Sequence, residues 1–142
     1  YLIVPPAVSL ALTGTLPFGF IVIGIGSMMW VAGFDVLYAT ADFKVDREQG
    51  LQSIPARFGI SAALVISRLL HGLAVILLAI AGVVLEASAL YSFGVVAAAV
   101  LLTYEQSLVS SNDLSKLNMA FFTMNGVIAV VFGTFVVIGE VI

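Results

Sequence analysis

The sequence contains no cysteine and very few charged residues. The absence of cysteine excludes disulfide frameworks and cysteine-ligated zinc sites. Only 9% of the residues are charged and 62% are hydrophobic, whereas a soluble domain has about 25% charged and about 45–50% apolar residues. With 142 residues, the chain is also too short for a soluble multidomain protein. The composition therefore predicts an integral membrane protein.

The apolar residues form long runs that are separated by short polar segments. A helix needs about 20 apolar residues to cross a bilayer, and four runs are close to that length. A shorter apolar run, 1–13, is expected to be the last part of another helix, because the chain opens inside it without a basic signal region. We therefore expect an all-α transmembrane helix bundle with four whole spans and a partial first one. The predicted whole spans are 17–42, 61–85, 92–108 and 117–139.

Basic residues gather on one side of this predicted topology. The polar surface loops 43–58 and 109–116 lie on the same side of the membrane and hold four of the five Lys and Arg residues. The turns 14–17 and 86–91, on the other side, hold none. Cytoplasmic loops are enriched in Lys and Arg. The charge pattern therefore predicts that the loops 43–58 and 109–116 are cytoplasmic.

Three aspartates lie at the cytoplasmic end of the first whole span. Asp35, Asp42 and Asp46 are spaced so that, on a continuous α-helix, they would share one stripe about 16 Å long. Mg²⁺ takes oxygen ligands and is commonly held by one or two carboxylates together with substrate phosphates. Asp42 and Asp46 can therefore hold an ion that bridges to a diphosphate, and they can equally be a solvated helix end. Asp35 lies deeper, where an ionisable group is a functional candidate by default.

The aspartates belong to a longer pattern, Asp35-x-x-Tyr38-Ala39-x-x-Asp42-x-x-x-Asp46. Together with the segments 50–59, 68–71, 104–105 and 113–126, it resembles the second aspartate-rich motif and the following helices of the UbiA superfamily of intramembrane prenyltransferases. The hydroxybenzoate polyprenyltransferase branch is the most similar. The family's first motif, N-D-x-x-D-x-x-x-D, and its Y-x-x-x-K-type motif are absent. Residues 1–142 therefore resemble only the C-terminal half of such an enzyme, and we expect this fragment alone to be inactive.

The resemblance implies a reaction and a set of partners. In such enzymes a polyprenyl group passes from a polyprenyl diphosphate to an aromatic acid such as 4-hydroxybenzoate, in ubiquinone or menaquinone biosynthesis. Mg²⁺ held by the aspartate motifs binds the diphosphate and favours its departure, and Asp42 and Asp46 match the second motif. We expect a lipid bilayer and no nucleic acid as partners. The expected location is a bacterial or archaeal cell membrane, with the active-site loops in the cytoplasm.

Seven further polar residues are candidates for this site, each with a structural alternative. Asp35 can orient an acceptor hydroxyl or take up the ring proton, or it can align its neighbours. Tyr38 can line the same cavity and bind substrate, or it can anchor the helix at the interface. Arg68 requires a carboxylate or a bound anion inside the membrane, and we expect a structural ion pair with Glu105. The remaining candidates for substrate contact are Arg57, His71, Asn118 and Asn125.

Two other classes of membrane protein carry comparable residues. A secondary transporter can use intramembrane Asp, Arg and His side chains as an ion relay. Its acids are expected near the midplane, however, whereas Asp42 and Asp46 lie at the cytoplasmic rim. CDP-alcohol phosphotransferases also carry D-x-x-x-D, but as part of a D-G-x-x-A-R signature, and here Ala56 and Arg57 follow the acids. A prenyltransferase is the preferred prediction, and a transporter is the alternative.

Overall fold

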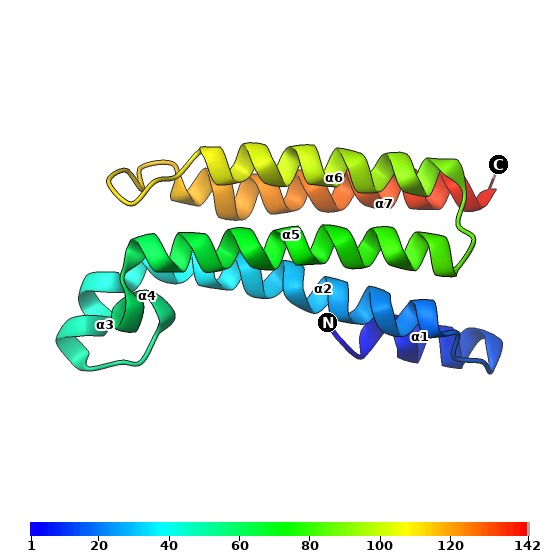
Figure 1. The fold of residues 1–142 in the computed structure, drawn as a ribbon, viewed down its shortest axis with the longest axis horizontal. Coiled ribbons are helices and arrows are strands. Elements are labelled where there is room, and N and C mark those ends of the chain that lie inside the picture. Colours follow the sequence, from blue (N-terminus) through cyan, green and yellow to red (C-terminus); the bar gives the residue numbers. More distant parts are fainter. Residues whose placement is uncertain (142) are drawn as a thin grey trace.

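The computed structural model describes residues 1–141, which form a bundle of roughly antiparallel long helices (Figure 1). The four longest helical segments are long and apolar enough to cross a membrane. No β-strand occurs among the described residues, so the predicted all-α class is confirmed. The main helices are α1 (Val4–Thr13), α2 (Phe18–Tyr38), α5 (Ile60–Val84), α6 (Ala89–Ser107) and α7 (Asn125–Val141), the last preceded by the π-helix η2 (Met119–Met124).

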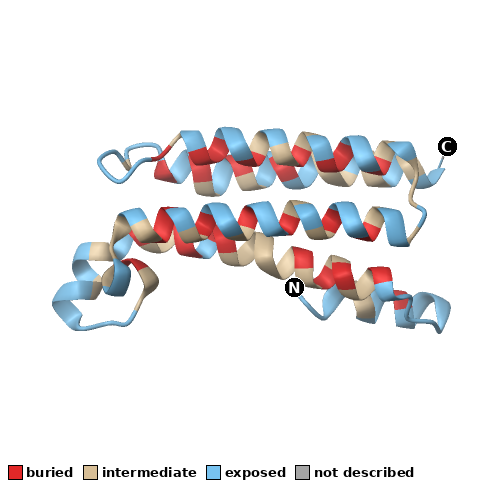
Figure 2. Cartoon of the chain, viewed as in Figure 1, coloured by how far each residue is buried: buried red, intermediate tan, exposed pale blue. Residues whose placement is uncertain are grey.

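Both the inner and the outer faces of these helices are apolar. Figure 2 shows buried positions where the helices meet and exposed positions along their outer faces. Many of the exposed residues are large and hydrophobic, such as Leu69 on α5, which is 68% exposed, and Val130 on α7, which is 69% exposed. A helix that is hydrophobic on all sides belongs in a protein core or in a membrane. The outer surface therefore fits a lipid bilayer.

The segment predicted as a polar surface loop, 43–58, is instead largely helical. It forms α3 (Phe43–Gln49) and α4 (Ile54–Phe58). Gly50 ends α3 with a positive φ of 70°, a conformation in which glycine carries no steric penalty. The Ser53 hydroxyl then caps α4 by accepting a hydrogen bond of 3.3 Å from the backbone N–H of Ala56. The loop prediction was wrong here, because these capping residues allow short helices to form in a segment of polar composition.

Two helix boundaries in the structure also differ from the predicted ones. Helix α6 begins at Ala89 rather than at residue 92, because Ser88 caps it by accepting a hydrogen bond of 3.4 Å from the N–H of Tyr91. The last span begins in the π-helix η2, whose wider turns include the two consecutive phenylalanines Phe121 and Phe122. Short π-helical segments inside α-helices occur frequently at functional sites.

Helices α2 and α5 approach each other closely at Gly33. A Cβ atom added at Gly33 would overlap the ring of His71 on α5. The hydroxyl of Ser67, one turn before His71, donates a hydrogen bond of 2.8 Å to the Gly33 carbonyl. The missing side chain at Gly33 is therefore what lets a histidine and a serine of α5 reach the surface of α2.

The replacement Gly33→Ala is expected to destabilise the bundle by about 1–3 kcal/mol, because the buried His71 ring would have to move. Gly133→Ala on α7 is the matched control, since a Cβ at Gly133 meets no atom within 4 Å. This control is expected to be neutral or slightly stabilising, as alanine is the better helix former. Thermal unfolding of the two variants in detergent measures the difference, and equal midpoints would contradict the close-packing argument.

Candidate functional site

The three aspartates lie on a helical segment whose winding changes. After α2 ends at Tyr38, the residues Ala39–Asp42 form a 3₁₀ turn, η1, and α3 follows directly. A 3₁₀ helix turns about 120° per residue instead of about 100°, so η1 rotates Asp42 by about 80° relative to a continuous α-helix. The single stripe expected from α-helical geometry is therefore corrected. Asp35 lies on α2, and Asp42 and Asp46 lie on a separately wound segment.

A buried threonine accompanies this change in winding. The hydroxyl of Thr40 donates a hydrogen bond of 2.6 Å to the carbonyl of Leu37, three residues earlier. Side-chain bonds of this local kind compete with the regular helical pattern. Thr40 is buried, and this contact lies in the turn that leads from α2 into residues 42–46, the acidic segment.

The carboxylates of this segment are accessible. Asp35 and Asp42 are exposed and Asp46 is partly buried. Within residues 1–141, none of the three has an ion-pair partner, and the ion pair present there joins His71 to Glu105. Asp42 directly precedes α3, yet its side chain makes no capping hydrogen bond. These oxygens are therefore available to a ligand.

A divalent cation would fit Asp42 and Asp46 only as part of a larger ligand set. The described residues contain no group of three or more His, Asp or Glu side chains that could hold a metal ion. Two carboxylates supply hard oxygen ligands, and Mg²⁺ usually completes its shell with substrate phosphates and water. The donor chemistry therefore suits a Mg²⁺ ion that is shared with a phosphate-bearing substrate.

An aromatic cluster lies next to the acidic segment. The ring of Tyr38 stacks on Phe121 of η2 with a centroid distance of 4.3 Å, and it meets Phe122 edge-on at 5.7 Å. Asp35 is about 200° around α2 from Gly33, the position that faces α5, so Asp35 points away from α5. The cluster of Tyr38, Phe121 and Phe122 thus joins the end of α2 to the start of the last span.

The two predicted asparagines flank this cluster in sequence. Asn118 is exposed just before η2, and Asn125 is partly buried at the start of α7. The intervening π-helix changes the angle between them from the value expected for a continuous α-helix. Arg57 follows the acidic segment in the chain and is exposed near the end of α4, with its guanidinium 5.2 Å from the ring centre of Phe58.

Glu105 pairs with His71 rather than with Arg68. The Nδ1 atom of His71 lies 3.3 Å from Oε2 of Glu105, and the two side chains are 3% and 0% exposed. Arg68 is exposed and has no ion-pair partner within residues 1–141. The expected Arg68–Glu105 pair is therefore wrong. The rotation of α5 about its axis explains why Arg68 does not reach Glu105. Ser67 and His71 face α2, and Arg68 is turned about 100° from Ser67 around the helix.

Two residues that the sequence did not single out complete this buried network. The Nε2 atom of Gln106 lies 2.9 Å from the Ser67 hydroxyl, to which it donates, and 3.1 Å from Nδ1 of His71. Two features of the sequence could have indicated them. Ser67 lies one helical turn before His71, and Gln106 lies beside Glu105, both within apolar spans. Buried polar groups of this kind are normally hydrogen-bonded to one another.

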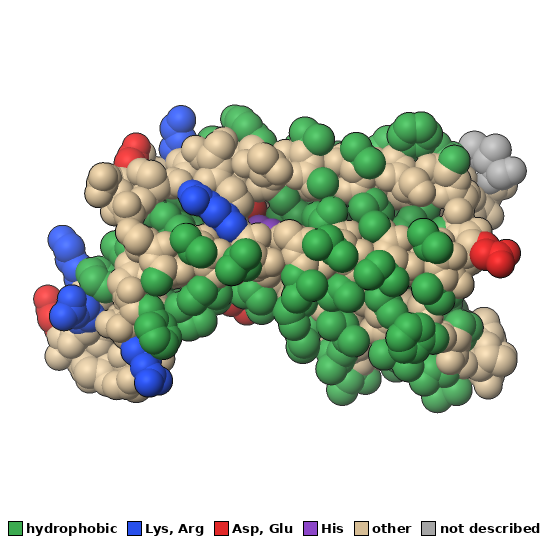
Figure 3. Space-filling model, viewed as in Figure 1, with side chains coloured by type: hydrophobic (Ala, Val, Ile, Leu, Met, Phe, Trp, Pro, Cys, Tyr) green, Lys and Arg blue, Asp and Glu red, His purple; other side chains and the backbone are tan. Residues whose placement is uncertain are grey.

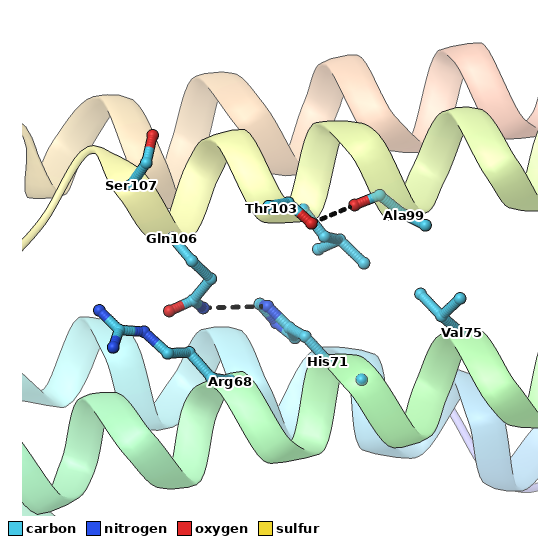
Figure 4. Close-up of a pocket in the computed structure, with 9 residues that line it drawn as sticks. Arg68, His71, Val75, Ala99, Thr103, Gln106 and Ser107 are labelled. Atoms are coloured by element: carbon cyan, nitrogen blue, oxygen red, sulfur yellow. Dashed lines mark hydrogen bonds between the residues drawn. The ribbon is translucent and has the colours of Figure 1, made fainter.

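A cavity of about 480 Å³ opens between α5 and α6 beside this network. Figure 4 shows Arg68 and His71 entering it from α5 and Gln106 entering it from α6. None of the three aspartates lines this cavity, and Asp35 points away from α5. The cavity lining consists of Arg68, His71, Gly72, Val75, Ala99, Leu102, Thr103, Gln106 and Ser107.

Comparison with known proteins gives a consistent set of relatives. Three of them are 4-hydroxybenzoate octaprenyltransferases. The one from Pseudomonas fluorescens is 32% identical over 82% of this chain and 39% of its own length. The one from Marinobacter nauticus is 31% identical over 70% of this chain and 33% of its own. The one from Pseudomonas syringae pv. tomato is 35% identical over 70% of this chain and 33% of its own length.

The matched part of this chain thus corresponds to between 33% and 39% of the length of these relatives. No solved structure matches the chain significantly. The model of the UbiA prenyltransferase family matches residues 1–136, which is nearly the whole sequence. The chain therefore belongs to the UbiA prenyltransferase family.

Proposed function

We propose that this chain is part of an integral membrane enzyme that transfers a polyprenyl group from a polyprenyl diphosphate to an aromatic acid such as 4-hydroxybenzoate. The observation that carries the proposal is the accessible pair Asp42 and Asp46, which has no ion-pair partner in residues 1–141 and follows directly on an apolar span. The names of the three relatives supply the acceptor and the class of donor.

Asp42 and Asp46 act on the diphosphate end of the donor. They would hold Mg²⁺, whose positive charge would support the departure of the diphosphate. Arg57, on the neighbouring helix α4, contributes a further positive charge to this end of the substrate. The carbon–oxygen bond of the donor breaks, and its electron pair leaves with the diphosphate.

The aromatic cluster of Tyr38, Phe121 and Phe122 shelters the resulting allyl cation. Aromatic faces attract cations within about 6 Å, and the apolar rings exclude water. The acceptor ring then forms the new carbon–carbon bond beside its hydroxyl. Asp35 takes up the proton that the ring loses, and Asn118 and Asn125 contact the substrates.

We place this chemistry on the cytoplasmic side of the membrane. Helices α3 and α4 and the loop between α6 and η2 lie at the same end of the bundle (Figure 1). Figure 3 shows Lys and Arg side chains concentrated toward this end. Because basic residues are enriched in cytoplasmic loops, this end faces the cytoplasm.

The test is product formation and its dependence on metal. Membranes that contain the whole enzyme of which this chain is part are expected to convert geranyl diphosphate and 4-hydroxybenzoate into a prenylated acid and diphosphate. Chelation with EDTA is expected to abolish the product, and added Mg²⁺ is expected to restore it. A panel of other aromatic acids, analysed by mass spectrometry, identifies the preferred acceptor. A proton-coupled flux into vesicles without any prenylated product would instead support a transporter.

A further inference from the structure

The cavity between α5 and α6 presents a hydrogen-bond acceptor beside a positive charge. Gln106 is 8% exposed, and its Nε2 atom is held by Ser67 and His71. Its other amide atom, Oε1, is buried and has no hydrogen-bond partner within residues 1–141. A buried acceptor without a partner destabilises the protein, so a ligand that donates to it is favoured. Figure 4 shows the Arg68 guanidinium and the Gln106 amide directed into the same space.

Two hydroxyl groups of α6 also belong to the cavity lining. The Thr103 hydroxyl donates to the Ala99 carbonyl at 2.8 Å, and the Ser107 hydroxyl donates to the Tyr104 carbonyl at 2.6 Å. With their hydrogens committed, both oxygens can only accept. The polar end of the cavity therefore suits a ligand that carries an anion for Arg68 and a hydrogen-bond donor close to that anion.

The rest of the cavity is apolar and continues onto an apolar surface. Val75, Ala99 and Leu102 line it, and the exposed residues beside it on the outer faces of α5 and α6 include Leu69 and Val100. A molecule that fills the cavity therefore needs an apolar part next to its polar end. A ligand dissolved in the bilayer meets this requirement, whereas a small soluble anion does not.

The depth of Arg68 agrees with the position of a lipid headgroup. Arg68 lies eight residues after Ile60, which is about 12 Å along α5 from the end of the bundle that carries α3 and α4. A long arginine side chain can extend toward the headgroup region while its stem stays among apolar groups. Its guanidinium is then available to a lipid phosphate.

We propose that this cavity binds the headgroup of a membrane glycerophospholipid. The lipid phosphate pairs with Arg68, and a neighbouring hydroxyl or ammonium group donates to Oε1 of Gln106. The first part of an acyl chain lies along Val75, Ala99 and Leu102. Phosphatidylglycerol and phosphatidylethanolamine carry such a donor, whereas phosphatidylcholine carries the phosphate without one. The site is separate from the one proposed for prenyl transfer, because none of the three aspartates lines the cavity.

Native mass spectrometry of the detergent-purified protein, titrated with each of these three lipids, tests the proposal. We expect phosphatidylglycerol and phosphatidylethanolamine to bind more tightly than phosphatidylcholine. Arg68→Gln is expected to weaken phosphatidylglycerol binding about tenfold or more, because a charge-assisted hydrogen bond is lost. Arg68→Lys, which keeps the charge, is expected to restore most of it. Lys116→Gln removes the same charge from an exposed loop position and is expected to change nothing.

Three results would overturn the proposal. Equal weakening by Arg68→Gln and Lys116→Gln would mean that the lipid responds only to overall charge. Equal binding of phosphatidylcholine and phosphatidylglycerol would remove the role of Gln106. Displacement of phosphatidylglycerol by inorganic phosphate or by 4-hydroxybenzoate would mean that the cavity takes a soluble anion. None of these results depends on whether the protein transfers a prenyl group, so the two proposals fail separately.

Discussion

Replacing Asp42 by asparagine is expected to lower the rate of prenyl transfer at least about a hundredfold, the scale seen when an electrostatic group that stabilises developing charge is removed. Asparagine keeps the size of the side chain but removes the negative charge that binds a divalent cation. The fold is expected to remain intact, because Asp42 is exposed and makes no capping hydrogen bond. Initial rates measured over a range of Mg²⁺ concentrations are expected to show a higher Mg²⁺ requirement as well.

Glu48→Gln is the matched control for this replacement. Glu48 is an exposed carboxylate on α3, two residues after Asp46, and its replacement removes the same charge from the helix that directly follows Asp42. Its rate is expected to stay near that of the wild type. Unchanged turnover in Asp42→Asn, or equal losses in both variants, would count against a specific metal-binding role for Asp42.

Replacing His71 by leucine is expected to destabilise the protein by about 3–5 kcal/mol. The buried Glu105 side chain would lose the nitrogen that lies 3.3 Å from its Oε2 atom. Reversible unfolding of the purified protein in mixed micelles measures this loss.

The double variant His71→Leu with Glu105→Leu separates two explanations for this loss. If it arises from a buried acid left without its partner, removal of both polar groups restores much of the stability, because apolar residues replace a buried pair at little cost. If it arises from the altered packing at Gly33, the double variant is at least as unstable as the single one. The second outcome would contradict the importance of the pair. The expected effects also differ in kind, since Asp42 changes the rate and His71 changes the stability.

The sequence by itself determined the class of the protein and the position of its spans. Runs of about 20 apolar residues have few stable alternatives to a transmembrane helix, since every backbone group must be hydrogen-bonded inside the bilayer. The predicted spans 61–85 and 117–139 agree closely with the helices Ile60–Val84 and Met119–Val141. The acid pair was equally visible, because it depends only on residue type and local spacing. The short helices α3 and α4 were predictable in principle from Gly50 and Ser53, which are local signals.

Only the tertiary structure decided which polar side chains meet. The partner of Glu105 depends on how α5 and α6 are rotated about their axes, and that rotation follows from packing contacts such as Gly33 against His71. The burial of Thr40, in the 3₁₀ turn between Asp35 and Asp42, likewise depends on the packing around it. The cavity beside Arg68 and Gln106 exists only between two packed helices. Local spacing gives the composition of each helix face, whereas the pairing of faces is a property of the whole bundle.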